Sequence, residues 1–252
     1  MKSIISLYKP VGMTPLQAVD AFKKKNTDYI GKKISYPGRL DPMAQGVLLL
    51  LVGDENKKMI KYMKLDKEYR AQIVFGFSTD SYDVLGLPEF HEGDIDEREL
   101  KKTIKSFQGT YTQTIPSFSS YKIKGKPLFY YARNKTLPKQ LPQKKVQIKN
   151  IKINSIHTIT ANRLLKQIQS KISKLEGDFR QEEILKQWNK LLTNKEQKFT
   201  IADVTLSVSS GTYIRAIADD LGKQLQTGAI LLNLIRTKVG KYDIGESVRL
   251  KK

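Results

Sequence analysis

The longest uninterrupted apolar run in the chain is residues 47–52, with the sequence VLLLLV. A helix that crosses a bilayer needs about twenty such residues, so this run is typical of a buried strand. The apolar start at residues 4–7 is also short and is closed by Lys9 and Pro10, which does not fit a secretory signal peptide. With 252 residues, 39% of them hydrophobic, the chain can form one large globular domain or two small ones.

Strand-like and helix-like segments alternate irregularly, without the steady rhythm of a doubly wound parallel sheet. The patterns predict an α+β fold with a mixed, largely antiparallel sheet flanked by helices. A change of alternation near Ala202 indicates a β-bulge. Expected strands are residues 3–8, 47–52, 69–77, 110–123, 146–159 and 199–208, and expected helices follow the N-cap candidates Thr14 and Asp54 or span 96–107 and 214–225.

One block, residues 161–198, stands apart because apolar residues recur in it at helical spacing on both sides of Gly177 and Asp178. This spacing predicts two amphipathic helices joined by a turn, inserted between two strands. A structural brace and a contact with RNA are equally compatible with the pattern, because amphipathic helices bury their apolar faces in either case. The apolar residues are Leu164, Ile168, Ile172, Leu175, Ile184, Leu185, Trp188, Leu191 and Leu192.

Charge is unevenly distributed in this strongly basic chain, which carries a formal net charge of +20. Between Glu99 and Glu176 there is no acidic residue, and 17 Lys or Arg residues lie there. Residues 80–99, in contrast, hold eight acids. A general bias toward lysine does not explain this segregation, so we expect the basic stretch to bind a polyanion such as nucleic acid.

The chain contains no cysteine and only two histidines, His91 and His157, which lie far apart in the sequence. This composition excludes disulfides, thiolate nucleophiles and cysteine-ligated zinc. It also fits a reducing cytosol. We therefore expect a cytoplasmic protein without a metal site, whose chemistry depends on carboxylates, hydroxyls, tyrosines, lysines or arginines.

The sharpest local motif is residues 38–46, GRLDPMAQG, which leads directly into the apolar run. Gly38 and Gly46 permit unusual backbone angles, and Pro42 stiffens the chain beside Asp41. A carboxylate on such a loop, at the mouth of a buried strand, is well placed to meet a ligand. Taken alone, an aspartate before a proline is more often a turn former.

This motif resembles the pseudouridine synthases in its first four residues and their TruB branch in its continuation through Gly46. Four further blocks, one before this motif and three after it, occur in the order and spacing of that family. The resemblance therefore covers residues 1 to about 160 and 199–249. The blocks are residues 9–14; 67–69 with 79–83; 116–122 with Gly125, Ala132 and Arg133; and 210–215 with 219–222, Gly228, Ala229 and Leu234.

The resemblance implies a cofactor-free enzyme in which Asp41 is the catalytic carboxylate. Attack on the base, attack on the sugar and abstraction of a sugar proton are three open routes. Tyr69 is implied to pack on the target base and can assist the final proton removal. Arg215 is implied to be the partner of Asp41, because a guanidinium can hold a carboxylate bidentately and keep it ionised in a dry pocket.

Asp83, Tyr213 and Leu234 are implied to line the substrate pocket, where the target base must leave its stack. Two substrate-binding positions depart from the family pattern. Tyr36 stands where a histidine is usual, and a tyrosine can stack but cannot become cationic. Arg39 is more typical of the branches that act on ribosomal RNA.

The implied activity is isomerisation of uridine 55 in the T-loop of transfer RNA by a monomer that contacts the T-arm. The chain ends at Lys252, so residues 1–252 are expected to form the catalytic domain, with 161–198 inserted and without the C-terminal PUA domain of many relatives. Alternatives are a pseudouridine synthase for another RNA and a non-catalytic protein that binds or folds RNA.

Overall fold

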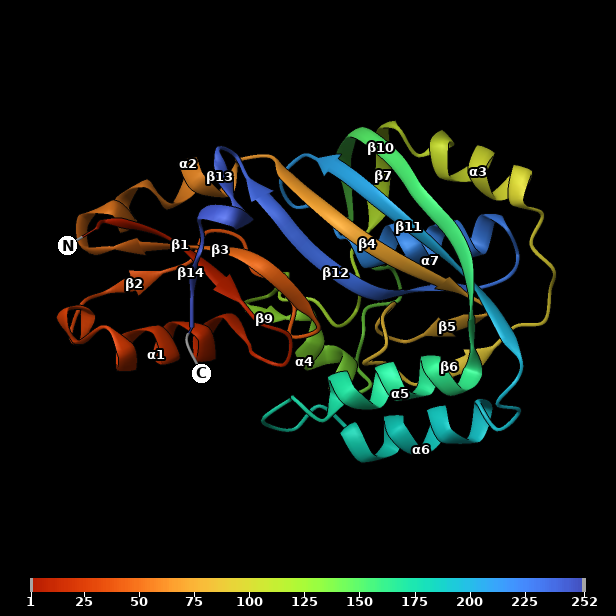
Figure 1. The fold of residues 1–252 in the computed structure, drawn as a ribbon. Helices are drawn as coiled ribbons and strands as arrows, with labels where there is room; N and C mark the ends of the chain where they lie inside the picture. The colour runs from red at the N-terminus through yellow and green to blue at the C-terminus, as the bar shows by residue number, and fades with distance from the viewer. Residues whose placement is uncertain (1, 251–252) are drawn as a thin grey trace.

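The computed structural model describes residues 2–250 and contains a mixed ten-stranded sheet (Figure 1). Its path runs β14 (Val248–Arg249), β1 (Ile4–Lys9), β3 (Ala44–Val52), β12 (Ala229–Val239), β4 (Lys67–Phe75), β11 (Lys198–Val208), β10 (Gln143–Thr160) and β7 (Gly109–Thr114), with β2 (Ile34–Ser35) and β13 (Tyr242–Asp243) beside β3 and β12. The pairs β1–β14 and β3–β12 are parallel, and the other pairs are antiparallel. The predicted fold class is confirmed.

Both faces of β3 are covered, which explains why its apolar run shows no alternation. Leu48 and Leu50 pack with Phe22 of α1 (Pro15–Lys25), whereas Leu49 packs on the opposite side with Tyr62. Thr14 begins α1 as expected: its hydroxyl accepts from the amide of Gln17, whose side chain accepts from the amide of Thr14. This reciprocal capping fixes the start of the helix directly after the first strand.

The sheet is also covered on both faces around β11 and β12. On one face, α3 (Glu97–Ser106) and α7 (Ile214–Gln224) pack over a core that includes Ala202, and on the other face Ile201 belongs to the core beneath the inserted helices. The bulge predicted near Ala202 is therefore wrong, because β11 pairs regularly there and its neighbouring residues simply enter two different cores. The register shifts lie in the partner strand β10, beside Lys149 and Asn154.

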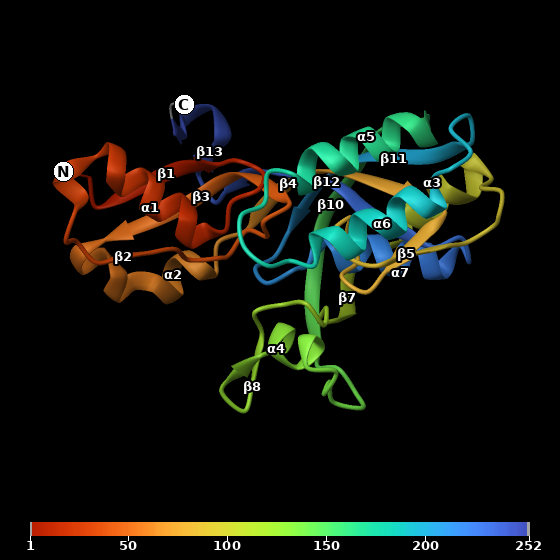
Figure 2. The same cartoon turned by 90° about the horizontal axis from the view of Figure 1, so that it is seen from below.

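The inserted hairpin forms as predicted, with α5 (Ala161–Ile172) and α6 (Gln181–Leu191) lying side by side under the sheet (Figures 1 and 2). Ile168 and Trp188 are fully buried in the core that the hairpin shares with β4, β11 and β12. The apolar faces of both helices are thus used to cover the sheet. Deleting residues 161–198 would expose this core.

An arm formed by residues 115–142 projects away from the sheet between β7 and β10 (Figure 2). It contains β8 (Lys122–Ile123), β9 (Lys126–Pro127) and α4 (Leu128–Arg133). The strand expected over residues 110–123 ends at Thr114, because Pro116 has no amide hydrogen to continue the ladder.

Three further differences from the expected elements are local. The strand β12 was not predicted, because it is buried almost throughout and Asn233 and Arg236 interrupt its apolar pattern. Asp54 does not cap a helix but pairs with Lys57 at 2.8 Å, within the 3-10 turn η2 (Gly53–Lys58) that precedes α2 (Met59–Met63). The strand expected over 69–77 breaks at Gly76. The remaining short elements are η1 (Thr27–Tyr29), β5 (Phe77–Thr79), β6 (Pro88–Phe90) and η3 (Ile244–Glu246).

Among residues 2–250, none of the helices combines the length and apolar character that crossing a bilayer would require.

Candidate active site

A cleft of about 940 Å³ opens where the loop before β3 meets the loop before α7. Seven of the eight predicted site residues line it: Tyr36, Arg39, Asp41, Tyr69, Tyr213, Arg215 and Leu234. Its described lining holds six cationic side chains, Arg39, Lys64, Lys67, Lys144, Arg215 and Arg236, against the single carboxylate of Asp41. Such a cleft attracts an anionic ligand and presents one acid to it.

The loop between β2 and β3, residues 36–43, carries Asp41 and is called the Asp41 loop below. Its backbone is bound by Arg236 of β12, which is 1% exposed. Its guanidinium donates to the carbonyl of Arg39 at 3.0 Å, to that of Gly38 at 3.2 Å and to that of Val47 at 2.7 Å. Gly46 allows the close approach, because a Cβ there would lie 2.2 Å from the carbonyl oxygen of Arg236. Charge-assisted bonds to three carbonyls make this loop a rigid platform.

Lys9 holds the same loop from its other side. Its ammonium donates to the carbonyls of Met13 at 2.7 Å and Pro10 at 2.9 Å, and it lies 3.5 Å from that of Pro42. Burial lowers the pKa of Lys9 to about 7, although the charge of Asp41 acts to raise it. The end of β1 and the residue after Asp41 are therefore joined by one buried lysine.

Arg215 contacts Asp41 through its Nε, which lies 3.1 Å from Oδ2 of the carboxylate. The expected bidentate contact is not formed, because the terminal nitrogens donate elsewhere: one to the carbonyl of Ser81 at 2.9 Å and the other to that of Phe118 at 3.1 Å. Burial acts to lower the pKa of Arg215, but the charges of Asp41 and Asp83 outweigh it and raise the pKa. Two backbone carbonyls thus aim a buried guanidinium at the carboxylate.

Tyr69, Leu234 and Tyr213 supply apolar surface around Asp41. Tyr69 and Leu234 lie on the adjacent strands β4 and β12, and both are largely buried, with 7% and 8% of their surface exposed. Tyr213 precedes α7, and burial followed by the charge of Asp41 raises its pKa. These side chains give the cleft an apolar floor next to its carboxylate.

Asp83 is the predicted pocket residue that lies outside the cleft lining. It is buried in the loop that follows β5, where its carboxylate accepts from the hydroxyl of Ser81 at 2.7 Å and from the amide of Leu85 at 2.9 Å. Burial raises its pKa, and the charge of Arg215 opposes that shift. Asp83 is thus a buried loop residue near enough to Arg215 for their charges to interact, and it does not line this cleft.

The rim of the cleft carries Tyr36 and Arg39. The Arg39 guanidinium lies 5.9 Å from the centre of the Tyr36 ring and donates to the hydroxyl of Ser120 at 2.7 Å. Arg39 thereby connects the Asp41 loop to the projecting arm. Four large apolar side chains along the same cleft are exposed: Leu16, Ile60, Met63 and Tyr121.

The sequence patterns missed Lys9, Lys67 and Arg236 as site residues. Lys67 donates to the carbonyls of Met63 and Leu65, and burial lowers its pKa to about 8. One signal was available for Arg236, since a charged residue within an apolar stretch is costly unless it is satisfied. In the part of the chain that the structure describes, no group of three or more Asp, Glu, His or Cys side chains is arranged to hold a metal ion.

Comparison with known proteins extends over the whole chain. The family model described as "TruB family pseudouridylate synthase (N terminal domain)" matches residues 24–177. The tRNA pseudouridine synthase B of Clostridium tetani is 31% identical over 252 residues, which cover 99% of this chain and 72% of that protein. The enzyme of the same name from Malacoplasma penetrans is 31% identical, covering 97% of this chain and 88% of that protein.

Solved structures share the fold at lower identity. A chain of a Cbf5-Nop10-Gar1 complex matches 98% of this protein with a TM-score of 0.60 and 20% identity, and this chain spans about half, 52%, of that chain's length. The sequence matches, taken with Asp41 and Arg215 in one basic cleft, show that this chain belongs to the TruB family of pseudouridylate synthases.

Proposed function

We propose that this protein is a tRNA pseudouridine synthase that isomerises uridine 55 in the T-loop, with Asp41 as its catalytic carboxylate. The observation that carries the proposal is the contact of Asp41 with the buried Arg215 on the floor of a basic cleft, in a member of this family. Relatives such as those from Clostridium tetani and Malacoplasma penetrans bear the name tRNA pseudouridine synthase B.

The chemistry suits the groups present. The bond between C1′ of the ribose and N1 of uracil breaks, the base turns, and a bond from C1′ to C5 replaces it. The proton on C5 is lost and N1 gains one, so the atoms of substrate and product balance without a cofactor. Asp41 provides the carboxylate for this rearrangement, and Arg215 contacts it through Oδ2.

The cleft also suits a single flipped nucleotide. Its volume falls within the range of about 300–1,000 Å³ that small-molecule sites occupy. Tyr69 and Leu234 offer surfaces for the base, and the exposed Tyr121 and Ile60 on the rim offer further surface for flanking nucleotides. Stacking of this kind offsets the cost of removing a base from its helix.

The T-arm of tRNA is the partner that we propose for the basic segment between Glu99 and Glu176. Many of its basic residues lie on the projecting arm and on β10, and Lys144 lies in the cleft itself. The site is assembled from one chain, which supports action as a monomer. We expect this activity in the cytoplasm, where unmodified tRNA is made.

The test is to incubate the purified protein with unmodified tRNA and to map pseudouridine at single-base resolution. We expect one modified position, in the T-loop, and none when that uridine is replaced by cytidine. Modification confined to ribosomal RNA would assign a different substrate. Tight tRNA binding without any pseudouridine would make the protein a binding or folding factor.

A further inference from the structure

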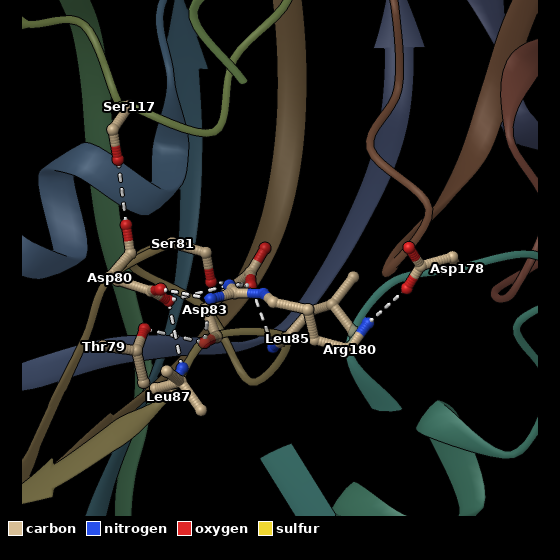
Figure 3. A network of polar contacts seen from close by, with 9 residues as sticks. All are labelled: Thr79, Asp80, Ser81, Asp83, Leu85, Leu87, Ser117, Asp178 and Arg180. Atoms are coloured by element: carbon tan, nitrogen blue, oxygen red, sulfur yellow. Dashed lines mark hydrogen bonds and ion pairs between the residues drawn. The ribbon is translucent and has the colours of Figure 1, made fainter. Parts of the chain in front are cut away.

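The inserted hairpin reaches the active-site region through one residue at its turn. Arg180, the residue before α6, makes a two-pronged ion pair with Asp80, with nitrogen–oxygen distances of 2.8 and 3.3 Å (Figure 3). Its guanidinium also lies 4.6 Å from the centre of the Phe118 ring. One side chain of the insertion therefore touches two segments that are 38 positions apart in the sequence.

These two segments are the ones that hold Arg215. Asp80 precedes Ser81, whose carbonyl accepts from one terminal nitrogen of Arg215, and the carbonyl of Phe118 accepts from the other. The segments are also joined directly, since the hydroxyl of Ser117 donates to the carbonyl of Asp80 at 3.0 Å. Arg180 thus braces both of the backbone groups that aim Arg215 at Asp41.

The loop at residues 79–87 is itself tightly folded around its two aspartates (Figure 3). Asp80 accepts from the amide of Leu87 at 3.0 Å, and Thr79 donates to the carbonyl of Asp83 at 2.8 Å. Gly86 permits this packing, because a Cβ there would lie 2.6 Å from the Asp80 carboxylate. A loop this compact moves as a unit, so a displacement of Asp80 is transmitted to Ser81.

We propose that Arg180 is a positioning residue for the isomerisation: it clamps the Asp80 loop to the Phe118 segment and so fixes Arg215 against Asp41. This inference rests on the proposed function. The role suits arginine, whose planar group can bind a carboxylate with two nitrogens while it stacks on a ring. A lysine in its place can make the charge contact without the stacking.

Two further contacts, one from each helix of the hairpin, hold it close to the loop that Arg180 binds. Lys171 of α5 donates to the carbonyl of Leu232. Burial lowers the pKa of Lys171 to about 7, although the charge of Asp83 acts to raise it. The indole of Trp188 donates to the carbonyl of Val84 at 3.2 Å. The hairpin therefore contacts this loop from α6 and from its turn, and it contacts the neighbouring strand β12 from α5.

The experiment compares Arg180→Ala, Arg180→Lys and Asp80→Asn with the wild-type chain. Arg163→Ala is the matched control, because Arg163 is an exposed arginine on the same insertion. Three quantities are measured for each: the single-turnover rate of pseudouridine formation at saturating tRNA, the dissociation constant for tRNA, and the emission of Trp188, the one tryptophan of the chain.

We expect Arg180→Ala to lower the single-turnover rate about tenfold, because small displacements of catalytic groups have effects of this order or larger. Affinity for tRNA should change less than about threefold, since the ion pair faces the protein and not the phosphates. Trp188 emission should stay that of a buried indole. Arg180→Lys should recover part of the rate, and the double variant with Asp80→Asn should be no slower than Arg180→Ala alone.

Several results would overturn the clamp. One is an unchanged rate in Arg180→Ala; another is a loss confined to tRNA affinity, which would make Arg180 an RNA contact; a third is an equal loss in Arg163→Ala. If Arg180→Ala does not fold, wild-type rates in both Arg180→Lys and Asp80→Asn would overturn the clamp equally. An inactive wild-type chain would instead refute the proposed function, so the two failures are distinguishable.

Discussion

Two loops meet at the site, and they are held in different ways. The Asp41 loop is fixed from inside the sheet by Arg236, which donates to three backbone carbonyls and, within residues 2–250, forms no salt bridge. The loop at residues 79–87 also bonds to its surroundings through backbone groups, and at Asp80 it is held from outside by a partly exposed ion pair with Arg180. Arg215 connects them, since it binds Ser81 on one loop and contacts Asp41 on the other.

The two kinds of contact contribute differently to the stability of the protein. A buried arginine whose three nitrogens each donate to a backbone carbonyl belongs to the folded core, so its loss affects folding as well as geometry. A partly exposed ion pair contributes little to global stability. Breaking the pair of Asp80 with Arg180 should therefore cost little global stability, whereas removing Arg236 should cost more.

Arg215 joins the two loops, and its removal should have the largest effect. Arg215→Ala leaves Asp41 without its partner and the carbonyls of Ser81 and Phe118 without their donor. We expect the single-turnover rate to fall by about a thousandfold or more, equivalent to about 4 kcal/mol of transition-state stabilisation. Arg215→Lys is the control, because it keeps the positive charge and removes the planar guanidinium. A rate near that of the wild type in a folded Arg215→Ala protein would remove the proposed ion pair.

The variant Arg236→Ala should show how the two loops differ, through its effect on the stability of the protein. Arg236→Ala leaves three carbonyls unsatisfied inside the protein, so the free energy of unfolding should fall by about 3 kcal/mol and the rate by about a hundredfold. Urea denaturation and single-turnover assays measure the two effects. If the rate falls while stability does not, the Asp41 loop is held no more firmly than the Asp80 loop, and the comparison fails.

The lysines of β10 should affect binding and leave the geometry of both loops intact. Replacing Lys144 and Lys145 with alanine should reduce the salt dependence of tRNA binding by about one to two phosphate contacts, without changing which uridine is modified. Lys186 and Lys190, exposed on α6, are the matched control pair. A slope that falls only in the control pair would move the RNA footprint onto the hairpin.

Lys171 should leave both loops in place and act only on the pH dependence of stability. Its pKa is about 7 in the folded chain and about 10.4 when unfolded, so the unfolded state binds more protons between these values. Stability should therefore rise with pH from about 7 to about 10, by at most ~1.4 kcal/mol per pH unit for this group. Lys171→Met should flatten the rise, measured by urea denaturation at several pH values; an unchanged slope would show that Lys171 does not contribute.

The sequence predicted the residues that line the cleft better than those that hold them in place. Asp41 and Tyr69 lie within motifs, and the structure places both in the cleft, as it does Arg215. Arg236 and Arg180 act through backbone carbonyls or a distant loop, and such contacts leave no spacing pattern in the sequence. Lys9 lies within the block at residues 9–14, but that block does not reveal which carbonyls its ammonium binds. Asp83 shows the converse: its motif marked a buried loop residue whose carboxylate bonds within its own loop and lies outside the cleft lining.

The fold was also harder to predict where the deciding contacts leave no pattern in the sequence. The inserted hairpin and most strands follow from periodicity, because each has one apolar face. The strand β12 lies between β3 and β4 with both faces covered, so it has no alternation to detect. Its pairing is decided by residues far away along the chain, and that pairing brings Arg236 under the Asp41 loop.

The proposed role of Asp41 as the catalytic carboxylate is tested most simply by Asp41→Asn. The rate of pseudouridine formation and the affinity for tRNA are measured in the same preparation. The substitution keeps the size of the side chain and removes its charge, while Arg236 and Lys9 still hold the loop. We predict that pseudouridine formation falls below detection while the dissociation constant for tRNA stays within about tenfold of the wild type. A folded Asp41→Asn protein that still forms pseudouridine would contradict the assignment of Asp41 and with it the central claim.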